Sequence, residues 1–226
     1  MIRQLAGLGG YIVLFALLLF VPAGTLQWPA AWVLLATLAA VRGLSIALLW
    51  RAQRALLEAR SSVPMPQSGQ PFVDRLLLPA IMAAFAGQVA FTARDVWYWH
   101  LTAGPAPWLR GVGLLAFVCG WGAVYLALRA NAFALTVVRL QQDRAQAVVA
   151  HGPYAVVRHP MYLGLLGVMA GLALWLGSLA GIAAAGVPSV LLVIRIIFEE
   201  RLLRAHLPGY AAYGERVPWR LLPGIW

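Results

Sequence analysis

Six long apolar stretches run along the chain, and they constrain its fold more than any other feature of the sequence. A helix needs about 20 apolar residues to cross a hydrocarbon core about 30 Å thick, and each stretch is close to that length. The stretches cover residues 5–24, 28–50, 76–93, 111–128, 161–176 and 179–198. Only Gly177 and Ser178 separate the last two, which predicts a tight helical hairpin. The sequence therefore predicts an all-α, polytopic integral membrane protein with about six transmembrane helices.

The composition agrees with a chain that is solvated by lipid. Apolar residues make up 62% of the 226 residues and charged residues 11%, against about 45–50% and about 25% in an ordinary globular domain. The net charge is +10, but most of the arginines fall between the apolar stretches instead of forming a basic stripe, so we expect no nucleic-acid partner. No pair of His or Cys residues has metal-ligand spacing, so we also predict no metal.

The arginines predict the orientation of the helices, because cytoplasmic connections carry the excess of positive charge. Residues 51–75, residues 129–158 and the segment from Arg195 onward hold most of them, whereas the alternate connections hold only Arg94 and Arg110. This pattern places both termini in the cytoplasm. Arginine without lysine is typical of a GC-rich bacterial genome, so we expect the bacterial inner membrane.

The chain has no internal repeat and no soluble domain boundary, so we expect one membrane domain over residues 1–226. Residues 1–129 hold the first four spans. Residues 51–73 are polar and contain three prolines, which predicts a loop after a short interfacial helix.

The densest motif precedes the fifth span and reads GPY from Gly152 and RHPMYLG from Arg158. The proline after His159 suits the first turn of a helix, and the free N–H groups there favour an anionic group such as a carboxylate. Tyr154 and Tyr162 offer aromatic faces to a flat ring or a sulfonium cation. The alternative is that Arg158 meets lipid phosphates and His159 caps a helix at the interface.

A second cluster lies at the cytoplasmic end of the last span. Arg195 and Glu199 are four residues apart and share a helix face, and Glu200 follows. Charged side chains at that depth in a membrane are costly unless they are paired or face a water-filled cavity, so they indicate a functional site. At such a site, Glu199 or Glu200 could accept hydrogen bonds from the ammonium group of a ligand. The alternative is a structural ion pair just outside the hydrocarbon.

Weaker features have a structural interpretation and a functional one. The aromatic and basic tail from Arg201 could cover a ligand site or simply anchor the chain at the interface. Gly120 and Gly122 in the fourth span favour close helix packing over ligand approach. Arg42 in the second span is interpreted as a snorkelling or structurally paired group.

Taken together, GPY-x3-RHP-x-Y-x-G, R-x3-EE and the tail resemble the isoprenylcysteine carboxyl methyltransferase family, of which the phosphatidylethanolamine N-methyltransferases are relatives. The resemblance covers residues 130–226, which it implies to be the cofactor-binding region. It implies an S-adenosylmethionine site at the cytoplasmic face. Residues that match the cofactor motifs are Gly152, Tyr154, Arg158, His159, Tyr162, Gly164 and Glu200. The resemblance implies catalytic positions at Arg195 and Glu199, and the chain departs from it at Gln146, where members often have histidine.

The expected activity is methyl transfer from S-adenosylmethionine to a lipophilic acceptor that enters from the bilayer. The acceptor could be a carboxylate, as in isoprenylcysteine, or an amine or a thiol. A carboxylate needs no base, whereas Glu199 or Glu200 could accept the proton of an amine. Two alternatives stay open: a membrane reductase of the sterol type that uses NADPH, and a non-enzymatic carrier with the same fold.

Overall fold

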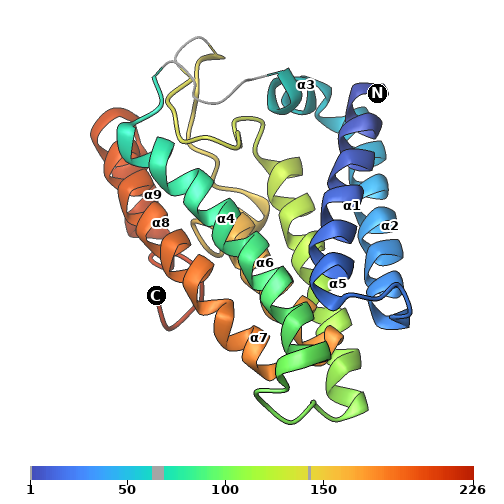
Figure 1. The fold of residues 1–226 in the computed structure, drawn as a ribbon. Coiled ribbons are helices and arrows are strands. Elements are labelled where there is room, and N and C mark those ends of the chain that lie inside the picture. The colour runs from blue at the N-terminus through green and yellow to red at the C-terminus, as the bar shows by residue number, and fades with distance from the viewer. Residues whose placement is uncertain (1, 63–68, 142–143) are drawn as a thin grey trace.

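A computed structural model describes residues 2–62, 69–141 and 144–226, and those residues contain helices and no β-strand. The helices are α1 (Ile2–Ala23), α2 (Pro29–Ala52), α3 (Arg54–Ser62), α4 (Phe72–Arg94), α5 (Pro107–Ala130), α6 (Pro160–Leu176), α7 (Leu179–Ala184), α8 (Gly186–His206) and α9 (Tyr210–Arg216). A π-helical turn η1 (Asp95–Trp99) extends α4, and a 3-10 turn η3 (Gly152–Ala155) precedes α6. The long helices form one bundle, in which α1 and α2 lie on the opposite side from α8 (Figure 1).

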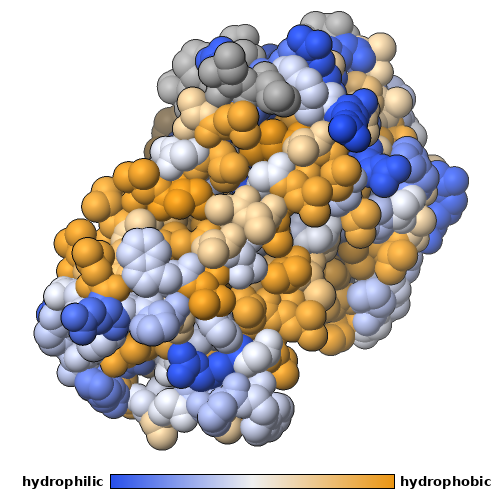
Figure 2. Space-filling view, turned by 90° about the vertical axis from the view of Figure 1, so that its right-hand side faces the viewer, coloured by the Kyte–Doolittle hydropathy of each residue, from blue (hydrophilic) through white to orange (hydrophobic). Residues whose placement is uncertain are grey.

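Five helical segments in the described residues are long and apolar enough to cross a membrane, which confirms the predicted polytopic fold. They are α1, α2, α4 with η1, α5, and α7 with α8. The predicted fifth span is α6, which is apolar but has only 17 residues. The face shown in Figure 2 has a broad apolar surface with hydrophilic residues gathered at two ends, as a lipid-facing surface requires.

The predicted sixth span differs from the observed one at its end. We expected it to stop at residue 198, but α8 continues to His206 through Glu199 and Glu200. The helix continues past the apolar stretch because glutamate, arginine and leucine are all good helix formers, so the end of the apolar pattern is not the end of the helix. The predicted short helix after α2 is confirmed as α3, while residues 63–68 of the predicted loop lie outside the described residues.

Glycines let α5 and α6 pack with their backbones in close contact. A Cβ atom at Gly120 would lie 2.5 Å from the Gly164 carbonyl oxygen, and one at Gly171 would lie 2.5 Å from the Phe117 nitrogen. The packing interpretation of Gly120 is therefore confirmed, whereas a Cβ atom at Gly122 would meet nothing within 4 Å. Small residues of this kind allow helices to associate in a membrane by van der Waals contact.

The chain reverses after α6, as the sequence predicts. Gly177 ends α6 with a φ of 102°, a conformation that favours glycine, and the Ser178 hydroxyl caps α7 by accepting from the Gly181 N–H. The returning helix α8 packs closely on α4, whereas α6 packs closely on α5. A small apolar cluster that includes Ile81, Tyr162 and Ile196 still joins α4, α6 and α8. This cluster holds the start of α6 beside the C-terminal half of α8.

Candidate functional site

A cavity of about 110 Å³ lies where the connection after α5, the start of α6, the end of α8 and the tail meet. Six of the predicted site residues line it: Tyr154, Arg158, His159, Tyr162, Arg195 and Glu199. Three do not line it: Gly152, Gly164 and Glu200. The fold thus brings together residues from two motifs that are more than 30 positions apart in the chain.

Arg158 and Glu200 form the buried centre of a polar network. The Arg158 Nε atom donates to Glu200 Oε1 at 2.6 Å, and both side chains are 3% exposed. Glu200 also meets His159 Nε2 at 3.2 Å and Arg220 Nε at 3.0 Å. Three basic side chains therefore surround one carboxylate, which explains how Glu200 stays buried in a helix that crosses the membrane.

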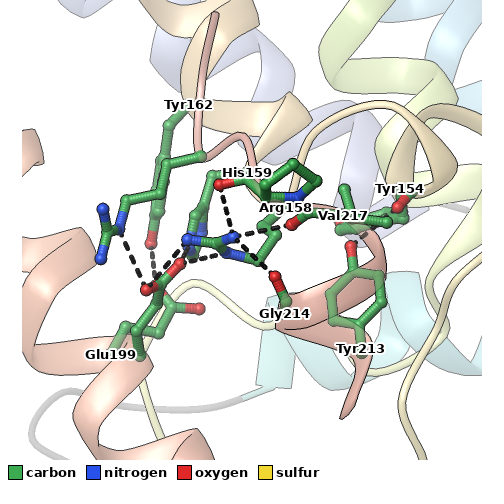
Figure 3. Close-up of polar contacts among 11 residues, drawn as sticks. Tyr154, Arg158, His159, Tyr162, Glu199, Tyr213, Gly214 and Val217 are labelled. Atoms are coloured by element: carbon green, nitrogen blue, oxygen red, sulfur yellow. Dashed lines mark hydrogen bonds and ion pairs between the residues drawn. The ribbon is translucent and has the colours of Figure 1, made fainter. Parts of the chain in front are cut away.

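The same guanidinium holds the C-terminal tail in place. Arg158 Nη1 donates to the carbonyl oxygens of Val217 at 2.7 Å and Pro218 at 2.8 Å, and Figure 3 shows it pointing toward this segment. The backbone N–H groups of Arg158 and His159 donate to carbonyl oxygens of Trp219 and Arg220. The tail is thereby fixed against the start of α6, so Arg158 positions the wall of the cavity.

Glu199 differs from its neighbour Glu200, because it lines the cavity and accepts a hydrogen bond from one side chain of the described residues. Tyr162 donates its hydroxyl to Glu199 Oε2 at 2.6 Å (Figure 3). The Tyr162 ring also stacks on the His159 ring, with centroids 5.5 Å apart and an interplanar angle of 18°. Among the described residues, no donor meets the Oε1 atom of Glu199, and the residue lines the cavity.

Arg195 pairs with a residue that sequence reasoning missed. Its Nε atom donates to Asp74 Oδ1 on α4 at 2.8 Å, and its Nη2 atom donates to the Thr136 carbonyl oxygen at 2.7 Å. Its Cζ atom lies 5.7 Å from the centre of the Tyr162 ring. A lone carboxylate near the start of an apolar helix is itself a signal of a buried pair, and Asp74 could have been singled out on that basis.

Two tyrosines of the cavity wall are held in the neutral form. Burial raises the pKa of Tyr154 to about 12 and that of Tyr213 to about 12. The Tyr213 hydroxyl donates to the Tyr154 carbonyl oxygen at 2.8 Å, which links α9 to η3. Burial also raises the pKa of Tyr210, which lines the same cavity, so these three tyrosines offer uncharged rings to a ligand.

The two predicted glycines have backbone functions away from the cavity. Gly152 begins η3 with a φ of 59°, a conformation that favours glycine. Gly164 lies against α5, where a Cβ atom would approach the Gly120 carbonyl oxygen to 2.6 Å. Gln146, where the resemblance expects histidine, does line the cavity, and its Oε1 atom accepts from the Gln141 N–H at 2.8 Å.

A second cavity of about 190 Å³ lies beside the first, between α4 and α8. Its lining is largely apolar and includes Leu77, Phe198 and Leu202. Arg195, Glu199 and Val138 line both cavities, so a wall with two charged side chains lies between an apolar space and a polar and aromatic one. The arrangement suits two different molecules that meet at this wall.

The C-terminal part of the chain is similar to known proteins. Residues 108–208 match the family described as phospholipid methyltransferase, which confirms the resemblance over residues 130–208 and extends it to α5, while residues 209–226 lie outside the match. A curated relative is the cobalt-zinc-cadmium resistance protein CzcN of Cupriavidus metallidurans, which is 32% identical over 112 residues. That match covers 49% of this chain and 45% of the relative, so the chain spans less than half the length of this relative.

Proposed function

We propose, from the match of residues 108–208 to the phospholipid methyltransferase family, that this integral membrane protein transfers a methyl group from S-adenosylmethionine to a lipophilic acceptor. The observation that carries the proposal is the shared wall of the two cavities, formed by Arg195 and Glu199. In-line displacement needs a donor and an acceptor that are aligned from opposite sides, and such alignment supplies about 7–11 kcal/mol of the barrier.

The chemistry of the first cavity fits S-adenosylmethionine. Glu199 Oε1 can accept from the ammonium group of the cofactor, while Tyr162 keeps the carboxylate in place through Oε2. The neutral rings of Tyr154 and Tyr210 can lie against a flat base or a sulfonium. When bound, the cofactor supplies a methyl group on a cationic sulfur, so the protein need not protonate the leaving group.

The second cavity fits the acceptor. Leu77, Phe198 and Leu202 offer apolar contact to a hydrocarbon chain that enters between α4 and α8. Arg195 stays fixed by Asp74 and can orient an acidic head group, as in an isoprenylcysteine carboxylate. For an amine acceptor, Glu199 is the group placed to accept the proton.

The orientation of the bundle is part of the proposal. The connection after α5, which carries several arginines, forms one wall of the first cavity. We place this end in the cytoplasm of a bacterial inner membrane, where the cofactor is available. A C-terminal alkaline phosphatase fusion that is active in growing cells would contradict this placement.

The proposal is tested by calorimetric titration of the detergent-purified chain with S-adenosylmethionine and, in parallel, with NADPH. We expect S-adenosylmethionine to bind and the affinity to fall by about 10-fold or more in Glu199→Gln, since a charge-assisted hydrogen bond contributes about 1.5–3 kcal/mol. Glu215→Gln is the matched control, because Glu215 is exposed on α9. Binding of NADPH alone would favour the reductase alternative, and binding of neither would favour the carrier.

The acceptor is tested in a separate assay of methyl incorporation. Prenyl-cysteine acids, phospholipid amines and lipophilic thiols are compared with water-soluble molecules that carry the same nucleophile. We expect turnover of at least one lipophilic class to exceed that of its soluble counterpart, because the second cavity is apolar. Equal or faster turnover of the soluble molecules would contradict the assignment of that cavity.

A further inference from the structure

A third cavity, of about 70 Å³, lies between α2, α3 and α5, apart from the two cavities described above. Its lining combines apolar side chains with two arginines, Arg42 and Arg60, and the indole of Trp121. A single water needs about 10–15 Å³ of such space, so the cavity holds several water-sized groups. None of the methyl-transfer steps proposed above uses it.

Arg42 brings a charge deep into the bundle. It lies ten residues before the end of α2, which places its Cα atom about 15 Å from that end. Its Cζ atom lies 4.6 Å from the centre of the Trp121 ring and 5.3 Å from that of Tyr11. Its Nε atom is buried without a hydrogen-bond partner in the described part of the chain, which leaves a donor for a ligand.

Arg60 and Trp121 line the same cavity and carry further donor groups. Arg60 Nη1 donates to the Ala134 carbonyl oxygen at 2.5 Å, an uncharged partner that leaves the positive charge uncancelled. The pKa of Arg60 is lowered to about 10, first by burial and next by the nearby charge of Arg42. Trp121 is 7% exposed, and its Nε1 atom also lacks a hydrogen-bond partner among the described residues.

No carboxylate in the described residues forms an ion pair with either arginine. The acidic groups that are paired have other partners: Glu58 has Arg54, Asp74 has Arg195, and Glu200 has Arg158, His159 and Arg220. Two guanidinium groups in a low-dielectric cavity repel each other, and burial of each is costly without a counter-charge. The cavity therefore has the charge and the free donors that an anion requires.

We propose that Arg42, Arg60 and Trp121 form a binding site for a phosphate-class anion. The forked N–H groups of arginine match the oxygens of a phosphate, and the indole N–H adds a neutral donor. Basic pockets between helices can bind lipid head groups, and this cavity extends from Arg42 inside the bundle to Leu57 and Arg60 on α3, beyond the end of α2. The phosphate could belong to an anionic phospholipid or to free phosphate. This site does not depend on methyl transfer.

Thermal unfolding of the full chain tests the site after exhaustive removal of lipid in detergent. The probes are inorganic phosphate, a short-chain phosphatidylglycerol and a short-chain phosphatidylcholine. The variants are Arg42→Gln and Arg60→Gln, and the control is Arg51→Gln, which removes an exposed charge from the same helix as Arg42. We expect a ligand to raise the Tm of the wild type and the control, with an apparent Kd at least about 10-fold weaker in both cavity variants.

The pattern of responses identifies the source of the phosphate. A response to phosphatidylglycerol that exceeds the one to phosphatidylcholine indicates a lipid, whereas a response to inorganic phosphate indicates the free ion. Without ligand, Arg42→Gln should unfold at or above the wild-type Tm, because an uncompensated buried charge has been removed. The proposal is overturned if no probe raises the wild-type Tm or if all variants respond equally to the probes. It is also overturned if Arg42→Gln lowers the Tm, relative to the wild type, by the same amount with and without ligand.

Discussion

Replacement of Glu200 by glutamine removes the one negative charge that three basic side chains share. The Glu200 side chain is 3% exposed, and its oxygens lie 2.6 Å from Arg158, 3.2 Å from His159 and 3.0 Å from Arg220. Removing one partner of a buried ion pair costs about 3–5 kcal/mol, because the other charge remains buried. Glutamine keeps one acceptor oxygen, so we expect the free energy of unfolding to fall by about 3 kcal/mol, at the lower end of that range.

A loss of this size is measurable as a shift in Tm. For a chain of about 150–250 residues, 1 kcal/mol corresponds to about 2–4 °C, so Glu200→Gln should lower the Tm by roughly 6–12 °C. The assay is tryptophan fluorescence during thermal unfolding in one detergent, without added ligand. The tail should also become more accessible to protease, because Arg158 holds it only while Glu200 keeps that guanidinium in position.

Glu199→Gln is the matched comparison, since it removes the same charge from the next residue of the same helix. Glutamine can still accept the hydrogen bond from Tyr162, and the side chain faces a cavity. We therefore expect a Tm change of less than about 4 °C, which corresponds to about 1 kcal/mol. Equal losses in the two variants, or a Glu200→Gln protein as stable as the wild type, would refute the assignment of Glu200 as the buried centre.

Two further predictions concern packing and pH. Gly164→Ala should lower the free energy of unfolding by about 1–3 kcal/mol, because its Cβ atom would approach the Gly120 carbonyl oxygen to 2.6 Å. Gly122→Ala is the control and should leave the Tm unchanged or higher. Similar losses of Tm in the two variants would contradict the packing argument. The pKa of Tyr154 is raised by burial to about 12, above the ordinary value of about 10 in an unfolded chain. Its contribution to stability should be complete below about pH 10 and lost as the pH rises toward 12, so the alkaline fall in Tm should be shallower in Tyr154→Phe, and an unchanged slope would contradict this.

The hydrophobic pattern of the sequence predicted the membrane helices because a bilayer imposes a length and a polarity on any segment that crosses it. The motif around Arg158 predicted a ligand site because its residue types and spacing are specific enough to resemble a family of membrane methyltransferases, and residues 108–208 match the family described as phospholipid methyltransferase. Six of the nine predicted site residues line one cavity. The predicted helices and the predicted site residues needed only local composition and order along the chain, whereas the cavity itself is a feature of the tertiary structure.

Partners across the bundle could not be predicted from the sequence, because they join residues that are far apart in the chain. The helical spacing put Arg195 and Glu199 on one face, yet Arg195 pairs with Asp74, which is 121 positions away. Glu199 and Glu200 are neighbours in sequence but point to different surroundings, since successive residues of a helix are turned by about 100°. One of them faces a cavity and the other is enclosed by three basic groups.

The sequence alone therefore determined that the chain has membrane-spanning helices and which motifs place polar side chains at one end of those helices. Only the tertiary structure decided which of those side chains hold the fold and which remain available to a ligand. The physical reason is that burial of a charge is tolerated only where helices distant in sequence bring its partners within hydrogen-bond distance. Arg158 and Glu200 have such partners, whereas Arg42, which the sequence left as a structural group, has a buried Nε atom that meets no acceptor in the described residues and lies beside a cavity.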